Sequence, residues 1–228
     1  MVTAVITPAP CGAMRPDMYK ALTAVLLSLV VGLSACKRGE SSPALADDLT
    51  AAEYNVLSAY TNGKFSGKPA SNGVSKLVFF NTTGCNDRHL LSDDNGQLLP
   101  WKRTAEFLRG KYPALQQATL DSFLRANLQQ ALVHSSFRLP VNYQLIDAAK
   151  ETSIFRKGGG SWDAFYQQYP GSSGIVTLSR VGFGVDGTQA LFYFEKVCGG
   201  LCGGGYYVAM EKRDSGWVIG AEINIWVS

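Results

Sequence analysis

The fold is set by the C-terminal stretch, residues 174–228, which reads GIVTLSRVGFGVDGTQALFYFEKVCGGLCGGGYYVAMEKRDSGWVIGAEINIWVS. Apolar and polar residues alternate along it in runs that Gly, Asp and Ser interrupt. This period-two pattern is typical of half-buried antiparallel strands. It predicts a four-stranded antiparallel meander, and helices expected before it would pack on the apolar face, which gives a fold of the α+β class.

Three turn signals divide this stretch. Asp186-Gly187 favours a two-residue hairpin, because both residues tolerate the positive φ that such a turn needs. The second turn falls between Cys198 and Cys202, which would then face each other at the end of a hairpin. We therefore expect a disulfide between these two cysteines. Ser215-Gly216 marks the third turn.

The register of the last strand follows from the need to keep one face apolar. We expect Val208 to lie opposite Ile223, because a slip of one residue would bring Glu222 to the core side. The first face then carries the main core residues: Val181, Phe183, Phe192, Phe194, Val208, Met210, Ile219, Ile223 and Ile225.

The second face of the meander mixes aromatic with polar residues and is the candidate binding site: Arg180, Tyr193, Glu195, Tyr207, Asn224 and Trp226. Aromatic rings offer contact area, while Arg, Glu and Asn orient a ligand, as expected of a recognition surface. The other interpretation is ordinary packing, because such sheets are often covered on both faces with their polar tips satisfied. The sequence leaves both interpretations open.

Upstream of the meander, periodicity predicts helices and short strands. Thr50 to Glu53 has the form of a capping box, in which a threonine hydroxyl and a glutamate satisfy helix amides. Further helices are expected at Trp101–Lys111, Thr119–Leu132 and Ser161–Tyr169, and strands at Lys76–Asn81 and Val141–Ile146. Helices followed by a curved sheet resemble the cones of nuclear-transport-factor-2-like (NTF2-like) proteins, many of which hold small ligands. This likeness is at the level of the fold and implies no residue.

The sequence of the N-terminal part predicts a targeting signal. Met18-Tyr19-Lys20 precede an apolar run, Ala21–Leu33, that has the length of a secretory signal rather than of a membrane-spanning helix. The run ends in Leu33-Ser34-Ala35-Cys36, which resembles the lipobox of bacterial lipoproteins. The resemblance covers this motif only and implies that Cys36 is acylated and becomes the first residue after cleavage. The alternative is an ordinary signal peptide cut near Ala35.

We therefore divide the chain into three parts. Residues 1–35 form the signal peptide, in which residues 1–13 fit no targeting pattern and indicate an over-long start. Residues 36–48 are a polar, lipid-anchored tether, and residues 49–228 form a single globular α+β domain. Two or more acyl chains anchor a protein stably, at about 0.8 kcal/mol per buried methylene, so the membrane is an expected partner. In bacterial lipoproteins an aspartate after the cysteine favours the inner membrane, and Lys37 therefore favours the outer membrane, facing the periplasm.

No residue pattern points to catalysis or to a metal. The chain has two histidines, His89 and His134, and no metalloprotease motif, while Cys198 and Cys202 sit in a Gly-rich turn without neighbouring ligands. The formal net charge is +3, with no basic run interleaved with aromatics, so we expect no nucleic-acid partner. We also expect no metal, no cofactor and no enzymatic activity.

The sequence favours a cell-envelope lipoprotein that binds a small molecule or an envelope protein without catalysis. Residues 179–228 are similar to the C-terminal segment of a recurring group of uncharacterised secreted bacterial proteins, and this similarity implies no activity. The alternative is a small periplasmic hydrolase or transferase that uses Cys85, the thiol expected to stay free, or a loop serine. Thiol or serine probes that label one residue of the folded protein would distinguish the two.

Overall fold

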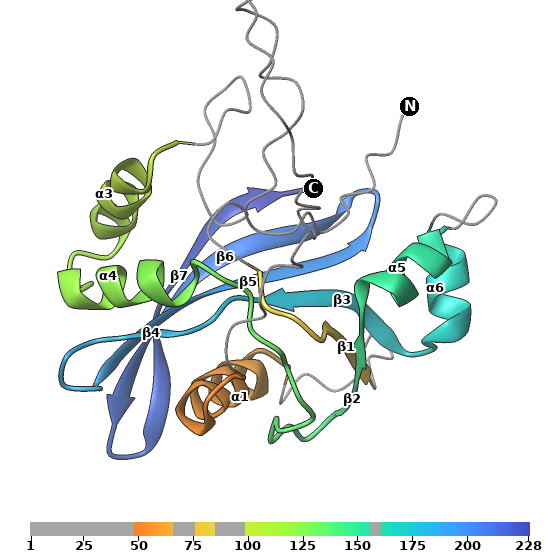
Figure 1. Cartoon of the computed structure of the whole chain (residues 1–228), viewed down its shortest axis with the longest axis horizontal. Helices are drawn as coiled ribbons and strands as arrows, with labels where there is room; N and C mark the ends of the chain where they lie inside the picture. Colours follow the sequence, from red (N-terminus) through yellow and green to blue (C-terminus); the bar gives the residue numbers. More distant parts are fainter. Residues whose placement is uncertain (1–47, 66–75, 85–98, 156–160) are drawn as a thin grey trace, which may run out of the picture.

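The computed structural model describes residues 48–65, 76–84, 99–155 and 161–228 (Figure 1). Its helices are α1 (Ala51–Phe65), α3 (Trp101–Lys111), α4 (Gln117–Ala126), α5 (Ala148–Phe155) and α6 (Trp162–Gln168). Its strands are β1 (Lys76–Phe80), β2 (Asn142–Ile146), β3 (Ser172–Leu178), β4 (Gly182–Phe183), β5 (Gln189–Gly199), β6 (Cys202–Arg213) and β7 (Gly216–Val227). The described residues therefore form a mixed α/β fold with one open sheet. None of the described helices is long and apolar enough to cross a membrane.

The sheet is mixed, with strand order β2-β1-β3-β5-β6-β7. The short strand β4 also pairs with β5, on the same side of β5 as β3. β1 runs parallel to β2 and β3, whereas the strands from β3 to β7 pair antiparallel. The predicted four-stranded antiparallel meander is therefore wrong. β5, β6 and β7 do form a meander, but the strand expected before them is broken into β3 and β4, and β1 and β2 extend the sheet. β1 is almost wholly buried, as is typical of an interior parallel strand, and its distant partners leave no local signal in the sequence.

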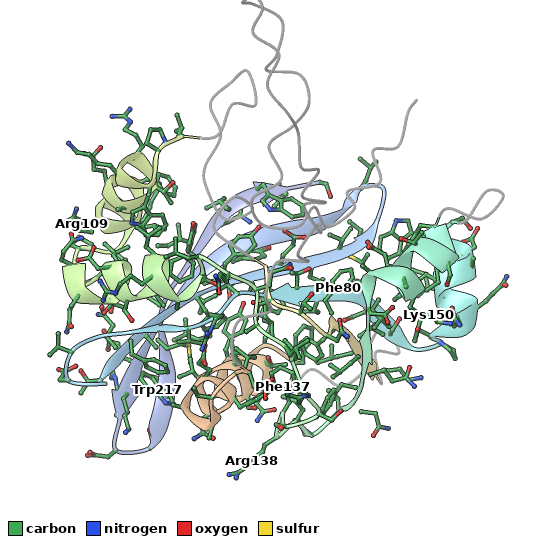
Figure 2. All side chains as sticks on the ribbon, in the orientation of Figure 1. Phe80, Arg109, Phe137, Arg138, Lys150 and Trp217 are labelled. Carbon is green, nitrogen blue, oxygen red and sulfur yellow. A yellow bond between two sulfur atoms is a disulfide. The ribbon has the colours of Figure 1, made fainter. Side chains whose placement is uncertain are left out.

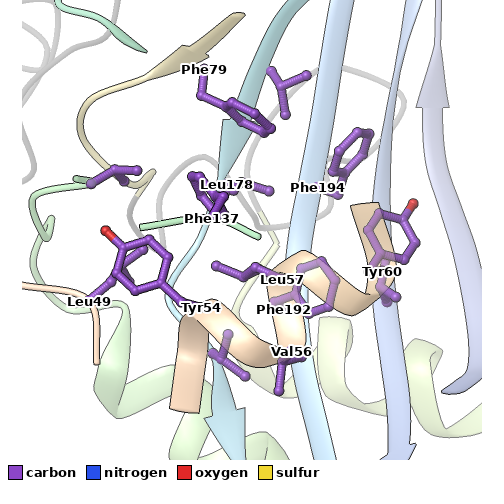
Figure 3. Packing of buried hydrophobic residues seen from close by; sticks show 14 of the residues in the cluster. Leu49, Tyr54, Val56, Leu57, Tyr60, Phe79, Phe137, Leu178, Phe192 and Phe194 are labelled. Atoms are coloured by element: carbon purple, nitrogen blue, oxygen red, sulfur yellow. The ribbon is translucent and has the colours of Figure 1, made fainter. Parts of the chain in front are cut away.

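Helices cover both faces of this sheet. The first face packs against α1, where Leu57 and Tyr60 meet Phe192 and Phe194 (Figure 3). On the second face α3 and α4 cover one end of the sheet, and α5 and α6 cover the end formed by β1, β2 and β3. Figure 2 shows side chains filling the space on both sides of the ribbon. The second face thus has two separate cores with the middle of the sheet between them.

The helix predictions are confirmed for α3, for the start of α1 and for the cap of α6, but not for the bounds of α4. α3 has the predicted bounds, and the capping box is confirmed by hydrogen bonds from the Thr50 amide to the Glu53 carboxylate and from the Glu53 amide to the Thr50 hydroxyl. Ser161 caps α6 as expected. α4 begins at Gln117 and ends at Ala126, so the predicted range Thr119–Leu132 starts too late and ends too late; the Thr119 hydroxyl and the Gln116 amide donate to the buried side chain of Gln189. α5 was not predicted.

The register of the first hairpins agrees with the prediction. Phe183 pairs with Ala190, and Phe192 pairs with Val208. The connection between β4 and β5 spans residues 184–188 and is therefore longer than the two-residue turn predicted at Asp186-Gly187. In both pairs the side chains that were expected on the first face lie there. The alternation of apolar residues was therefore sufficient to fix these strands.

The register of the last strand differs from the prediction. Its turn is Asp214-Ser215, and a bulge between Ala209 and Met210 leaves Val208 opposite Glu222 rather than opposite Ile223. Ile223 consequently packs on the second face, under α3 and α4, while Ile219 is exposed. Glu222 is tolerated on the first face because Tyr60 and Lys64 of α1 satisfy its carboxylate. Ile225 also packs on the second face.

The break between β3 and β4 is stabilised by one side chain from α1 and by one that directly follows α4. Glu53, which is 3% exposed, accepts hydrogen bonds from the Arg180 Nε and Nη2 atoms, both at 3.1 Å, and from the Val181 amide. Asn127, which follows α4, pairs with the amide and carbonyl of Arg180. The backbone groups that the broken strand leaves unpaired are thus satisfied within the core.

We predict that Glu53→Ala lowers the free energy of unfolding by about 3–5 kcal/mol, because it leaves the half-buried Arg180 without its carboxylate and the Val181 amide without an acceptor. Urea unfolding measures this loss. Glu106→Ala is the matched control, since Glu106 pairs with Arg103 on an exposed helix surface, and should cost less than about 1 kcal/mol. Equal losses in the two variants would contradict the prediction.

The same carboxylate predicts a pH dependence. Burial opposes ionisation of Glu53, but the hydrogen bonds from Arg180, Thr50 and Val181 outweigh it and hold the pKa of Glu53 below its ordinary value of 4.5. A carboxyl with a lowered folded-state pKa stabilises the fold above its unfolded pKa, and this stabilisation is lost as the pH falls through the folded value. The difference in unfolding free energy between the protein and Glu53→Gln should therefore be constant near neutral pH and shrink in acid. A difference that grows in acid would contradict this sign.

Candidate functional site

The middle of the second face carries a row of residues that runs across four neighbouring strands. Thr177 of β3 pairs with Glu195 of β5, Glu195 with Gly205 of β6, and Gly205 with Trp226 of β7. We call this set the Gly205 row. It lies between the core under α3 and α4 and the core under α5 and α6.

A chain of hydrogen bonds links three side chains at this row. The Trp226 indole Nε1 donates to the Tyr193 hydroxyl at 2.8 Å, and that hydroxyl donates to the Glu195 carboxylate at 3.1 Å. Tyr193 is buried, while Glu195 and Trp226 are half-buried. The arrangement combines an aromatic surface, a hydroxyl and a negative charge at one place.

Gly205 makes this meeting possible because it lacks a side chain. A Cβ atom at Gly205 would overlap both the Trp226 indole and the Tyr193 hydroxyl, and one at Gly203 would press against the far ring of the same indole. Trp226 therefore lies over a glycine surface on β6. Glycine within a strand is typical of such close approaches.

Electrostatics fix the role of the Tyr193 hydroxyl. Burial, together with the neighbouring charge of Glu195, raises the pKa of Tyr193 well above its ordinary value. The hydroxyl therefore keeps its proton at physiological pH and acts as a hydrogen-bond donor to Glu195. It is unsuited to act as a general base.

The structure brings together only part of the predicted site. The ring of Tyr207 lies edge-on to that of Tyr193, with ring centres 5.6 Å apart. Tyr207 is, however, fully buried against Phe123, so it belongs to the core. Asn224 is exposed and lies opposite Tyr206 on the first face rather than on the predicted second face, and its amide donates to the carbonyl of Trp226 at the bulge in β7. For Tyr207 the packing interpretation was the correct one.

Arg180 does not lie on the predicted binding face. It was expected opposite Tyr193, but the strand is broken there, and the Tyr193 amide donates to the Ser179 hydroxyl instead. The guanidinium of Arg180 is turned to Glu53 at the start of α1. The candidate site therefore has no contribution from this arginine.

Two residues of the row were missed in the sequence, Thr177 and Gly205. The signal for Gly205 was present, because three consecutive glycines inside a strand pattern indicate a close approach of another group. The sequence could not place Thr177 at the site, because Thr177 reaches it only through the pairing of β3 with β5, which no local pattern indicates.

The cysteines divide into a described pair and residues outside the described part of the chain. Cys198 and Cys202 form a disulfide across the tip of the β5–β6 hairpin, with Cα atoms 5.0 Å apart, as predicted. Cys36 of the predicted lipidation site, and Cys85 of the alternative enzymatic hypothesis, lie outside the described residues. In the part that the structure does describe, no group of three or more His, Cys, Asp or Glu side chains is placed to hold a metal ion.

We predict that Gly205→Ala lowers the free energy of unfolding by about 1–3 kcal/mol, because the new methyl group must displace the Trp226 indole or the Tyr193 hydroxyl. Gly63→Ala is the matched control: the site lies in α1, nothing occupies the space around its Cβ, and the change should raise stability by about 0.5–1 kcal/mol. Thermal or urea unfolding of both variants measures the expected loss of stability in Gly205→Ala and the expected gain in Gly63→Ala. A Gly205→Ala protein as stable as the parent would show that the indole does not lie over this glycine.

Comparisons of the chain with protein-family models, with curated proteins and with solved structures give no match. The chemistry of the Gly205 row is therefore argued from its own residues. An indole offers a surface for stacking, and a carboxylate held by a tyrosine offers an acceptor for a donor or a cation. Together they are suited to recognition.

Proposed function

We propose that the protein is a non-catalytic binding module of the bacterial cell envelope and that the Gly205 row holds its ligand. The observation that carries the proposal is the hydrogen-bonded chain from Trp226 through Tyr193 to Glu195. An indole of this kind stacks on a flat apolar group, while the carboxylate orients a hydrogen-bond donor beside it. The ligand is a small molecule or an exposed segment of an envelope protein that presents both features.

The protonation state of Tyr193 supports binding rather than catalysis. General acid–base catalysis needs a group with a pKa close to the working pH, and burial moves the pKa of Tyr193 away from that range. The fixed hydroxyl serves instead to orient Glu195. As the sequence leads us to expect, the proposal includes no enzymatic activity, no metal, no cofactor and no nucleic-acid partner.

The proposed location rests on the sequence. Leu33-Ser34-Ala35-Cys36 resembles a lipobox, and we propose that Cys36 carries the lipid that anchors the chain. Residues 37–48 would then tether residues 49–228 to the outer membrane, on its periplasmic side. A tether of about twelve residues reaches roughly 20 Å as a coil, so the binding module would stay close to the membrane surface.

The NTF2-like likeness belongs to the same proposal. Such proteins hold ligands against a curved sheet, and the Gly205 row lies across the sheet of this protein. The mixed pairing of β1, β2 and β3 is a difference from the all-antiparallel sheet on which the likeness was based.

The test is a native mass spectrum of the full-length protein, extracted from its own membrane in mild detergent without reducing agent. We expect an acyl mass on a chain that starts at Cys36, together with an additional retained mass. Glu195→Gln, which keeps the shape but removes the charge, and Trp226→Ala should both lose the retained mass. Glu106→Gln, on the exposed surface of α3, should keep it.

Two results would contradict the proposal. An unacylated chain would refute the lipid anchor, and a retained mass that persists in both site variants would refute the Gly205 row. Labelling of Cys85 or of one serine by an activity probe in the folded protein would support the alternative hydrolase or transferase instead. Unfolding curves of each variant separate a lost ligand from a lost fold.

A further inference from the structure

The ammonium group of Lys64 lies within a set of aromatic rings on the first face of the sheet. Its Nζ atom is 4.6 Å from the ring centre of Tyr206, 5.7 Å from that of Tyr60 and 6.0 Å from that of Phe194. The same atom forms an ion pair with the Glu222 carboxylate. We call Tyr60, Phe194, Tyr206 and Glu222 the cage.

The core of the protein holds the walls of the cage in place. Tyr60 is fully buried and meets Phe194 edge-on with ring centres 5.2 Å apart, and its hydroxyl points out of the cluster (Figure 3). Tyr206 lies over Gly204, where a Cβ atom would come within 3.2 Å of its ring. Tyr60 and Phe194 are thus part of the core, and the half-buried Tyr206 packs against it.

The carboxylate is held in place independently of Lys64. The Tyr60 hydroxyl donates to Glu222 Oε2 at 2.8 Å, while Lys64 binds the other oxygen. Glu222 reaches this face only because of the bulge in the β6–β7 pair that shifts the strand from its expected register. The fold thus presents three rings and an oriented negative charge to one cation.

Three aromatic rings with a carboxylate are the arrangement by which proteins bind organic ammonium cations. We propose that the cage is a binding site for an organic ammonium ligand, and that Lys64 occupies it until the ligand displaces it. A quaternary or N-methylated ammonium suits the site best, because it is less strongly hydrated than lysine and offers more apolar surface to the rings. The cage lies on the first face, whereas the Gly205 row lies on the second, so this proposal does not depend on the proposed function.

Lys64 is suited to be displaced. It stands in the last turn of α1, and its side chain is 30% exposed, so it can rotate into solvent without unfolding the helix. A partly exposed ion pair of this kind contributes little to stability. Lys111 also ends a helix, and its Nζ atom lies 5.7 Å from the ring centre of Phe107 alone. This contact with a single ring serves as the control for the cage.

The experiment is calorimetric titration of the full chain with choline and with dimethylbutanol, its uncharged carbon isostere. If Lys64 fills the cage in about nine molecules out of ten, Lys64→Ala should bind choline about tenfold more tightly than the parent protein. Dimethylbutanol should bind neither protein measurably. Lys111→Ala is the matched control and should bind choline as the parent does.

A second change tests the walls of the cage. Tyr206→Leu, introduced into Lys64→Ala, replaces the nearest ring by an aliphatic side chain and should abolish the gain in choline binding. Lys64→Gln, which keeps most of the side-chain stem, repeats the test if the alanine variant unfolds. The proposal is overturned if Lys64→Ala gains no affinity for choline, if it binds choline and dimethylbutanol equally, or if Lys111→Ala gains as much.

Vesicles distinguish the two sources of such a ligand. Sedimentation of the Lys64→Ala protein, made with Cys36→Ala so that it carries no lipid of its own, with phosphatidylcholine vesicles but not with phosphatidylglycerol vesicles would indicate a lipid headgroup. Binding of free choline without any preference between the vesicles would indicate a soluble ammonium compound. Either result agrees with the cage, and neither involves Glu195 or Trp226, so failure here leaves the proposed function standing.

Discussion

The buried pair of Glu53 and Arg180 is the interaction on which the rest of the structure depends. Glu53 caps the first turn of α1 and at the same time receives two bonds from Arg180 and one from the Val181 amide. One carboxylate therefore fixes where α1 begins, where it docks, and where the strand before β5 breaks. A buried charge without its partner is strongly destabilising, so these three features form or fail together.

The break in the strand also positions the candidate site. Ser179 lies at the break, and its hydroxyl accepts a hydrogen bond from the Tyr193 amide while its own amide donates to the Tyr193 carbonyl. The backbone of Tyr193 is thus held on both sides although no regular strand lies opposite it. This anchoring lets the Tyr193 side chain extend along the second face to Trp226 and Glu195. The position of the candidate site on the second face consequently depends on the ion pair between Glu53 and Arg180 at the start of α1.

What could be predicted from the sequence was local. The capping box at Thr50, the cap at Ser161, the bounds of α3 and the pairing of Phe192 with Val208 all follow from signals within a few residues, and each is confirmed. The parallel pairs of β1 join residues far apart in the chain, where period and turn chemistry carry no information. Glu222 was placed on the wrong face because the rule that a carboxylate avoids the core ignores the partners that a helix supplies, here Tyr60 and Lys64. Arg180 was misplaced for the same reason, since its partner Glu53 is distant in sequence.

The glycine run of β6 explains why both proposed sites occur on the same strands. Successive side chains of a strand point to opposite faces, so Gly204 and Gly205 leave space on the first and second face respectively. Tyr206 fills the first space and Trp226 the second, and each aromatic ring becomes part of a site. The bulges in the β6–β7 pair complete the arrangement by turning Glu222 to one face and Trp226 to the other. The two sites therefore share the backbones of β5, β6 and β7 but no side chain, and any influence of one on the other must pass through these strands.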